Sequence, residues 1–184
     1  IVRTYDYRDE QNELLYQVVR CEPKDFRQRR PDGKGGWAWD LKGVRPLVYG
    51  LPSLARQSRV YIVEGEKDVE RLRSLGLSAT CNSGGAGKWT NDLTQQLLEA
   101  GVQEVIVLSD NDDPGRKHAE SVARSCFAVG LAVKIVALPD LPPKGDASDF
   151  LDAGGTVDDV EALVESAPLW TPEALRRSMR QEGK

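Results

Sequence analysis

From Val60 onward the chain alternates short apolar segments with longer amphipathic ones, and this alternation leaves few folds open. The predicted strands are VYIV (60–63), SATC (78–81), EVIVLS (104–109) and LAVKIVAL (131–138). Amphipathic stretches between them predict helices at 66–76, 90–101 and 114–130. Uninterrupted apolar strands that alternate with such helices indicate a parallel sheet covered on both faces. We therefore expect an α/β domain with a four-stranded, mostly parallel, Rossmann-like sheet flanked by helices.

Residues 1–59 show the pattern of a small antiparallel sheet instead. VRTYDYR (2–8) and ELLYQVVRC (13–21) predict two strands joined by a turn. A unit of about 50 residues is close to the lower size limit for independent stability, so we expect this lobe to pack on the α/β body. Trp37 and Trp39 share one strand face, and we expect them in the core of the lobe rather than on a base-stacking surface.

Two more helices are predicted near the C-terminus. Thr156 and Asp159 form a capping box for VDDVEALVES, and Pro172 is suited to the first turn of EALRRSMR. These signals divide the chain into a basic β-rich lobe at 1–59, an α/β domain at 60–154 and C-terminal helices or a linker at 155–184. Because the chain begins with Ile rather than Met, we expect it to be a piece of a longer protein.

The net charge of −4 is distributed unevenly. Residues 1–59 carry 12 Lys and Arg against 8 Asp and Glu, a net charge of +4, and the remainder carries 13 against 21, a net charge of −8. The basic part either contacts nucleic-acid phosphate or is a solvated face. The sequence has neither an apolar run of about 18 residues nor a signal-peptide pattern, so we expect a soluble protein with no membrane partner. Three separated cysteines and one histidine argue against a zinc site in this chain.

Acidic residues follow three of the predicted strands. Glu64 follows the first, Asp110 and Asp112 follow EVIVLS, and Asp146 follows the last through a loop. The C-terminal ends of parallel strands meet at one edge, where ligands bind. Carboxylates with phosphate and water are the ligands that Mg²⁺ prefers, so Asp110, Asp112 and Glu64 predict a metal site. Acidic residues also cap helices, and we expect Asp113 to have that role for the helix that starts near Pro114.

The glycine-rich segment NSGGAGKWT (82–90) is similar to a phosphate-binding loop but lacks the required pattern, since Lys88 is followed by Trp89. A glycine-rich turn before a helix still offers backbone N–H groups to an anion. Gly84, Gly85 and Lys88 are therefore candidate phosphate contacts. A tight turn between strand and helix explains the same glycines.

These acidic motifs together resemble the Toprim domain of bacterial-type primases, type IA and type II topoisomerases and certain nucleases. The resemblance rests on VYIVEGEKDVERL, VLSDNDDPGRKHAE and KGDASDFL, within residues 60–151. It implies that Glu64 acts as a general acid or base, that Asp110 and Asp112 hold Mg²⁺ or Mn²⁺, and that Asp146 supports the metal site. Ser148 stands where primases more often have a carboxylate, which affects the ligands of a second metal.

The segment from Glu22 to Leu54 is similar to the stretch that precedes Toprim in primases, above all in phage and plasmid primase-helicase proteins. That similarity implies a primase core that makes RNA primers from nucleoside triphosphates on single-stranded DNA. It implies a helicase domain or subunit as partner and a place in the bacterial cytoplasm, encoded by phage or plasmid. The basic residues that it places against nucleotide or template phosphates are Lys24, Arg27, Arg29, Arg30 and Lys42. Two alternatives stay open: strand cleavage by a nuclease or topoisomerase, and a non-catalytic nucleic-acid-binding module.

Overall fold

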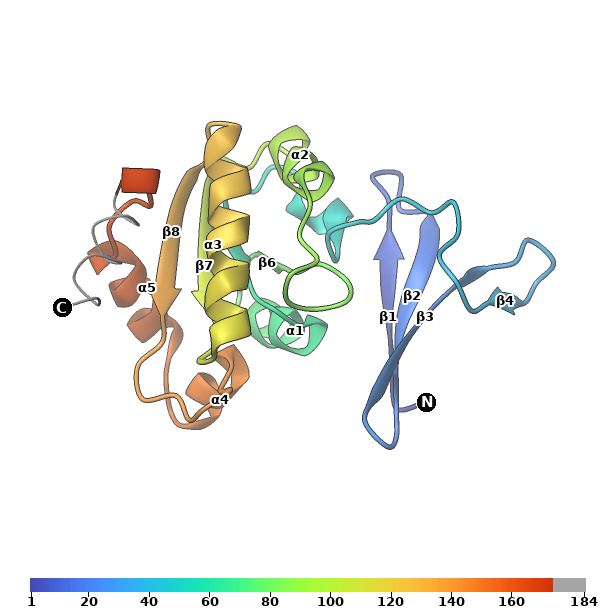
Figure 1. Ribbon diagram of the computed structural model, residues 1–184, viewed down its shortest axis with the longest axis horizontal. Coiled ribbons are helices and arrows are strands. Elements are labelled where there is room, and N and C mark those ends of the chain that lie inside the picture. Colours follow the sequence, from blue (N-terminus) through green and yellow to red (C-terminus); the bar gives the residue numbers. More distant parts are fainter. Residues whose placement is uncertain (174–184) are drawn as a thin grey trace.

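The computed structural model describes residues 1–173 and contains two sheets within them (Figure 1). The larger sheet has the order β6-β5-β7-β8, and all its strand pairs are parallel. Its strands are β5 (Arg59–Ile62), β6 (Ala79–Thr80), β7 (Glu104–Ser109) and β8 (Ala132–Ala137). β7 lies between two neighbours, and its residues 105–108 are buried, as an uninterrupted apolar strand requires. The predicted α/β class with a four-stranded parallel sheet is confirmed.

Helices cover this sheet and connect its strands. They are α1 (Glu66–Ser74), α2 (Asn91–Glu99), α3 (Asp113–Ala128), α4 (Ala147–Asp152) and α5 (Val157–Ser166). α3 packs on β7 and β8, while α1 contacts β6 and α5 contacts β8. The capping box predicted for α5 is present, because Thr156 Oγ1 accepts from the Asp159 amide and the Asp159 carboxylate accepts from the Thr156 amide. The helix predicted from Glu173 onward lies almost entirely outside the described residues.

The N-terminal residues form an antiparallel sheet in the order β1-β2-β3-β4. Its strands are β1 (Arg3–Arg8), β2 (Leu14–Cys21), β3 (Asp25–Pro31) and β4 (Trp37–Ala38). The first two strands agree with the sequence pattern. β3 was not expected, because DFRQRRP has no apolar alternation; it is a strand through its pairing with β2, from Gln17 opposite Arg29 to Cys21 opposite Asp25.

Buried tyrosines join the N-terminal sheet to the α/β body. Tyr7 and Tyr16 are stacked with ring centroids 4.5 Å apart, and Tyr49, from the segment that leads to the 3₁₀ turn η1 (Leu51–Leu54), packs against Tyr7 at 5.2 Å. The Tyr7 hydroxyl donates to Glu66 Oε1 at the start of α1, at 2.7 Å. The two sheets therefore share one continuous core, in agreement with the expectation that so small a lobe packs on the body.

Trp37 and Trp39 are not core residues of the N-terminal sheet, so that expectation was wrong. Their side chains are 37% and 53% exposed. β4 has two residues and pairs with β3 at the edge of the sheet, which leaves both indoles at the surface. In the described part of the chain, no helix is both long and apolar enough to cross a membrane.

Candidate metal centre

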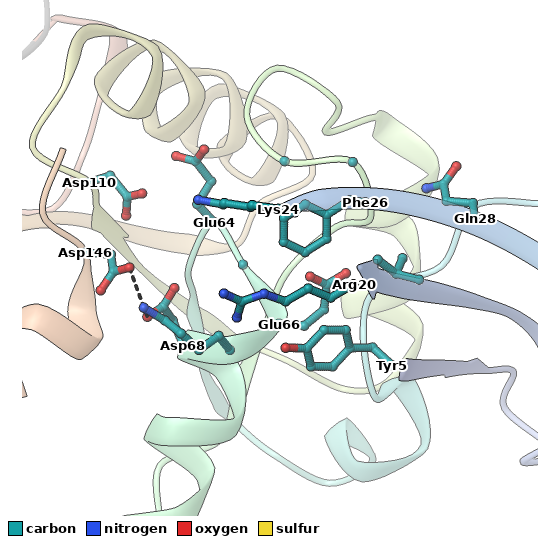
Figure 2. Close-up of a pocket in the computed structure, with 15 residues that line it drawn as sticks. Tyr5, Arg20, Lys24, Phe26, Gln28, Glu64, Glu66, Asp68, Asp110 and Asp146 are labelled. Carbon is teal, nitrogen blue, oxygen red and sulfur yellow. Dashed lines mark hydrogen bonds and ion pairs between the residues drawn. The ribbon is translucent and has the colours of Figure 1, made fainter. Parts of the chain in front are cut away.

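Four acidic residues lie at the C-terminal edge of the parallel sheet, and we call them the acidic edge. Glu64 follows β5, Asp68 lies in the first turn of α1, Asp110 follows β7 and Asp146 precedes α4. They line one cavity of about 590 Å³. The N-terminal sheet forms the opposite wall, from which Arg20 and Lys24 project toward the acidic side chains (Figure 2).

Asp110 and Glu64 are the two residues of the acidic edge whose negative charge is less balanced by neighbouring groups. Burial, followed by the charges of Glu64 and Asp68, raises the pKa of Asp110 to about 8, and a hydrogen bond with Glu64 acts in the same direction. Two adjacent carboxylates that are partly shielded from water require a shared proton or a cation. This pair is therefore suited to a divalent cation, whose charge would remove the repulsion.

The donor atoms fit a hard cation that is bound together with a substrate. Within residues 1–173, no three His, Cys, Asp or Glu side chains converge closely enough to enclose a metal ion by themselves. Mg²⁺ usually takes one or two protein carboxylates and completes its octahedron with water and phosphate. Glu64 and Asp110 are oxygen donors of that kind, and the cavity in front of them is large enough for phosphate.

The other half of the acidic edge has cationic and hydroxyl partners from the chain itself. Lys67 Nζ lies 2.7 Å from Asp146 Oδ2 and 3.6 Å from Asp68 Oδ1. Burial is the largest single influence on Asp146 and opposes its ionisation. The hydrogen bonds from Lys67 and from the Asp149 amide, together with the Lys67 charge, outweigh burial and lower the pKa of that carboxyl. Burial raises the pKa of Asp68, and a hydrogen bond from the Ser148 hydroxyl offsets this only in part.

Asp146 is also held by a helix cap. Its Oδ1 accepts from the Asp149 amide at 3.0 Å, and Asp149 Oδ2 accepts from the Asp146 amide at 3.0 Å. This capping box begins α4, a helix that the sequence pattern did not predict. Both Asp146 oxygens are therefore engaged, one by Lys67 and one by the cap, which favours a supporting role for Asp146 over direct metal ligation.

The cap of α3 is Asp112 rather than Asp113, so the expectation that Asp113 caps this helix was wrong. Asp112 Oδ1 accepts from the Gly115 amide at 2.7 Å. Asp113 is the first helical residue and pairs with Arg116 at the surface. The cap occupies one Asp112 oxygen, and Asp112 does not line the cavity. Its role as a metal ligand is thus less well supported than that of Asp110.

The glycine-rich loop borders the same cavity. Gly84 and Gly85 line it, both with positive φ, and Asn82 Nδ2 braces the loop by donating to the Gly85 carbonyl at 2.8 Å. Lys88 is exposed and is not among the cavity-lining residues.

The predicted basic residues are divided between the two faces of the N-terminal sheet. Lys24 lines the cavity together with Phe26 and Gln28. Side chains alternate along a strand, so Arg27 and Arg29 lie on the opposite face. Arg30 pairs with Asp40 at 3.0 Å, and the exposed Lys42 is near the same carboxylate, which accepts from its amide.

The structure adds two basic residues that sequence reasoning did not nominate, Arg20 and Lys67. Arg20 is the one basic residue of β2 and lies on the face that carries Val18, so strand alternation was the signal that could have identified it. Lys67 lies next to Asp68 in the motif EGEKD, but its contact with Asp146 bridges 79 positions and has no local signal.

A family model described as Toprim-like matches residues 61–151. The DNA primase of Chlamydia muridarum is 30% identical over 97 residues, which are 50% of this chain and 16% of that protein. The Gene 57 protein of Mycobacterium phage D29 is 33% identical over 99 residues, 53% of this chain and 62% of the phage protein. The chain thus spans only a small part of the bacterial primase that it matches.

Solved primase structures share the fold. The zinc-binding and RNA polymerase domains of Aquifex aeolicus primase superpose with a TM-score of 0.72 at 24% identity, over 97% of this chain and 43% of that one. The primase fragment of the bacteriophage T7 primase-helicase protein gives a TM-score of 0.59 at 20% identity, over 88% and 61%. The family match agrees with the parallel sheet and with the acidic edge that it presents. We conclude that residues 61–151 of this chain form a Toprim-like domain, which is similar in sequence to part of bacterial DNA primase.

Proposed function

We propose that this chain is part of the catalytic core of a DNA primase, which joins ribonucleoside triphosphates into a primer on single-stranded DNA. The observation that carries the proposal is the Glu64 and Asp110 pair, set across one cavity from Arg20 and Lys24. Phosphoryl transfer depends mainly on positioning and on charge neutralisation. A cavity with carboxylates on one wall and cations on the other provides both.

Each wall has a distinct role in this proposal. Arg20 and Lys24 bind triphosphate or template phosphate through their positive charges. The backbone amides around Gly84 and Gly85 offer further hydrogen-bond donors. Glu64 accepts or returns the proton of the attacking hydroxyl. Mg²⁺ or Mn²⁺, held by Glu64 and Asp110 with support from Asp112 and Asp146, would neutralise charge on the attacking and leaving oxygens.

The partners follow from the same assignment. We propose that the chain acts with a helicase domain or subunit in the cytoplasm of a bacterial cell. The support is the similar fold of a fragment whose parent is described as a primase-helicase protein and the similarity to a phage protein.

The test is primer synthesis on a single-stranded DNA template with the four ribonucleotides and Mg²⁺ or Mn²⁺. Asp110→Asn removes one carboxylate charge from the acidic edge and should lower synthesis on the order of 100-fold or more. Asp113→Asn is the matched control, because Asp113 is a solvent-exposed acid three positions away whose ion pair is at the surface, and it should leave synthesis near the wild-type rate.

Two results would overturn the assignment. The first is undiminished synthesis by the Asp110→Asn protein. The second is nicking of supercoiled plasmid without added nucleotides, which would favour the nuclease or topoisomerase alternative. Within residues 1–173, no tyrosine is an exposed nucleophile, because all of them are buried: Tyr5, Tyr7, Tyr16, Tyr49 and Tyr61.

A further inference from the structure

The N-terminal sheet has an outer face, turned away from the cavity, that the proposed chemistry does not use. Phe26 and Gln28 of β3 line the cavity, so the alternate residues Arg27 and Arg29 lie on the outer face. Their cross-strand neighbours there are Val19 and Gln17. Arg29 Nε donates to the Gln17 side-chain oxygen at 2.8 Å, so this guanidinium is held by a neutral amide.

Two exposed indoles lie beside Arg29. The Arg29 guanidinium carbon is 4.1 Å from the Trp37 ring centroid and 5.4 Å from that of Trp39. β4, which begins at Trp37, is at the end of the N-terminal sheet away from the parallel sheet (Figure 1). Contiguous exposed aromatic side chains on a soluble protein usually mark an interaction site.

The hairpin that carries the indoles is ordered before any ligand binds. Asp32 Oδ1 accepts from the amides of Lys34 and Gly36, at 2.7 and 2.8 Å. Arg30 and Asp40 form an ion pair at 3.0 Å on the two sides of the hairpin. These contacts fix the turn between β3 and β4, so a ligand that stacks on the indoles pays little ordering entropy.

The charge around the indoles is positive. Residues 25–45 contain six Lys and Arg against three Asp, a net charge of +3. Asp25 and Asp40 are paired with Arg27 and Arg30. Among the described residues, Arg29, Lys34 and Lys42 have no ion-pair partner. This excess of unpaired cations, in the segment that carries the exposed aromatic rings, favours a polyanion that also presents flat apolar faces.

We propose that Arg29, Trp37 and Trp39 form a binding surface for single-stranded nucleic acid, on the sheet face opposite the acidic edge. Unpaired bases stack on aromatic side chains, whereas a duplex hides its base faces. Arg29 and the neighbouring lysines then contact the phosphates. The choice of ligand rests on the proposed function, but the surface is separate from the metal centre, so it binds a strand without metal or nucleotide.

The test uses the intrinsic fluorescence of the protein. The other tryptophans, Trp89 and Trp170, are only 8% and 7% exposed, so a stacking ligand should quench mainly Trp37 and Trp39. We expect an unlabelled single-stranded oligonucleotide, added without Mg²⁺ or nucleotides, to quench the emission of the wild-type protein. A duplex of the same sequence should do so much less.

Substitutions separate base stacking from other contributions to binding. The affinity for a labelled single strand is measured by fluorescence anisotropy. The double variant Trp37→Ala with Trp39→Ala should bind about ten- to a hundredfold more weakly. The double Phe variant keeps aromatic faces and should stay within about threefold of wild type. Phe127→Ala is the matched control, because Phe127 is a similarly exposed aromatic residue on α3, 41% exposed.

The outcomes are distinguishable from those of the priming assay. The proposed binding surface would be wrong if the double Ala variant bound the single strand as tightly as wild type, or if a duplex bound equally well. The first of these results is also the one expected if the surface binds a protein partner instead. Asp110→Asn should bind and quench like wild type. A wild-type protein that quenches but makes no primer would overturn the proposed function and leave this surface standing.

Discussion

Asp110 and Asp146 lie at the same edge of one sheet, yet their pKa values are shifted in opposite directions. Asp146 has the Lys67 ammonium 2.7 Å away, and its pKa is lowered. Asp110 faces Glu64 instead, and burial with neighbouring negative charge raises its pKa to about 8. The chain therefore compensates the Asp146 carboxylate internally, whereas Asp110 has the surroundings in which we propose that a divalent cation binds.

The Asp110 shift makes the stability of the metal-free protein depend on pH. An acid whose pKa is higher in the folded state binds its proton more tightly when folded, so its stabilising contribution is complete below the unfolded value of about 3.9. That contribution is lost as the pH rises toward 8. In EDTA, the thermal midpoint of wild type should fall across this window, and that of Asp110→Asn should fall less.

Added Mg²⁺ gives the complementary measurement. The cation must displace the proton held by Asp110 at low pH, so it should raise the thermal midpoint more at pH 8 than at pH 6. An equal effect at both pH values, or the same pH dependence in wild type and Asp110→Asn, would mean that Asp110 does not carry the titration.

Lys67 provides a second prediction at the level of a single residue. Lys67→Met keeps the aliphatic stem but removes the ammonium that lies between Asp146 and Asp68. The cost should be about 1 kcal/mol, because the lysine side chain is nearly half exposed and the ion pair is screened by water. Millimolar Mg²⁺ should restore part of that loss by supplying the missing positive charge.

Thermal melts of three proteins check this prediction. Lys67→Arg should keep most of the stability, since it keeps the charge. Lys117→Met, at an exposed position of α3, should resemble wild type with and without Mg²⁺. If Lys67→Met were destabilised but insensitive to Mg²⁺, the lysine would have a purely packing role.

At the scale of elements, two helices begin with a capping box, but only one of the two boxes lies at the acidic edge. α4 begins at the Asp146 and Asp149 capping box, and α5 at that of Thr156 and Asp159. Asp149→Ala removes the N3 carboxylate of the first box, and Thr156→Ala removes the N-cap side chain of the second. Each should cost about 1 kcal/mol, which corresponds to roughly 2–4 °C in thermal midpoint for a chain of this size. Only the α4 cap positions a residue of the acidic edge.

The two variants should therefore differ in their rate of primer synthesis although they are destabilised to a similar extent. Asp149→Ala releases the backbone amide of Asp146 from its acceptor and should lower synthesis severalfold at a temperature where both proteins are folded. Thr156→Ala should leave synthesis unchanged. Equal activities would show that the α4 cap has no influence on the acidic edge.

The elements themselves were predictable to different degrees. The parallel strands and α1, α2, α3 and α5 have apolar periods long enough to recognise, and α5 also has its capping box. α4 has six residues, too few to show a helical period. β3 is polar, and it becomes a strand because β2 offers a hydrogen-bonding partner, which no local pattern records.

The site was predictable where topology alone decides position. Strand ends of a parallel sheet meet at one edge, so Glu64 and Asp110 could be placed together from the sequence. The contact of Lys67 with Asp146 depends on how α4 docks, and the exposure of Trp37 depends on how short β4 is. Such long-range features have no signal within a local window.

At the scale of the whole molecule, the cavity lies between two sheets that share one core and are also joined by a buried hydrogen bond. Tyr7 of β1 is fully buried and donates to Glu66, the first residue of α1, which itself lines the cavity. Burial raises the pKa of Glu66, and the hydrogen bond from Tyr7 opposes that shift. One buried hydroxyl thus links the N-terminal sheet to the helix that follows Glu64.

Tyr7→Phe tests this link between the sheets. It leaves a buried carboxylate without its donor, at a cost of about 1–3 kcal/mol, and hydrogen exchange should accelerate in β1 and β2 more than in β7 and β8. Tyr61→Phe is the matched control, because the Tyr61 hydroxyl donates to Glu161 wholly within the α/β body. It should destabilise the protein without selectively exposing the N-terminal sheet. If both variants accelerated exchange in β1 and β2 to the same extent, the Tyr7 hydroxyl would contribute to overall stability alone, and the packing of Tyr16 and Tyr49 would suffice to hold the wall that carries Arg20 and Lys24 over the acidic edge.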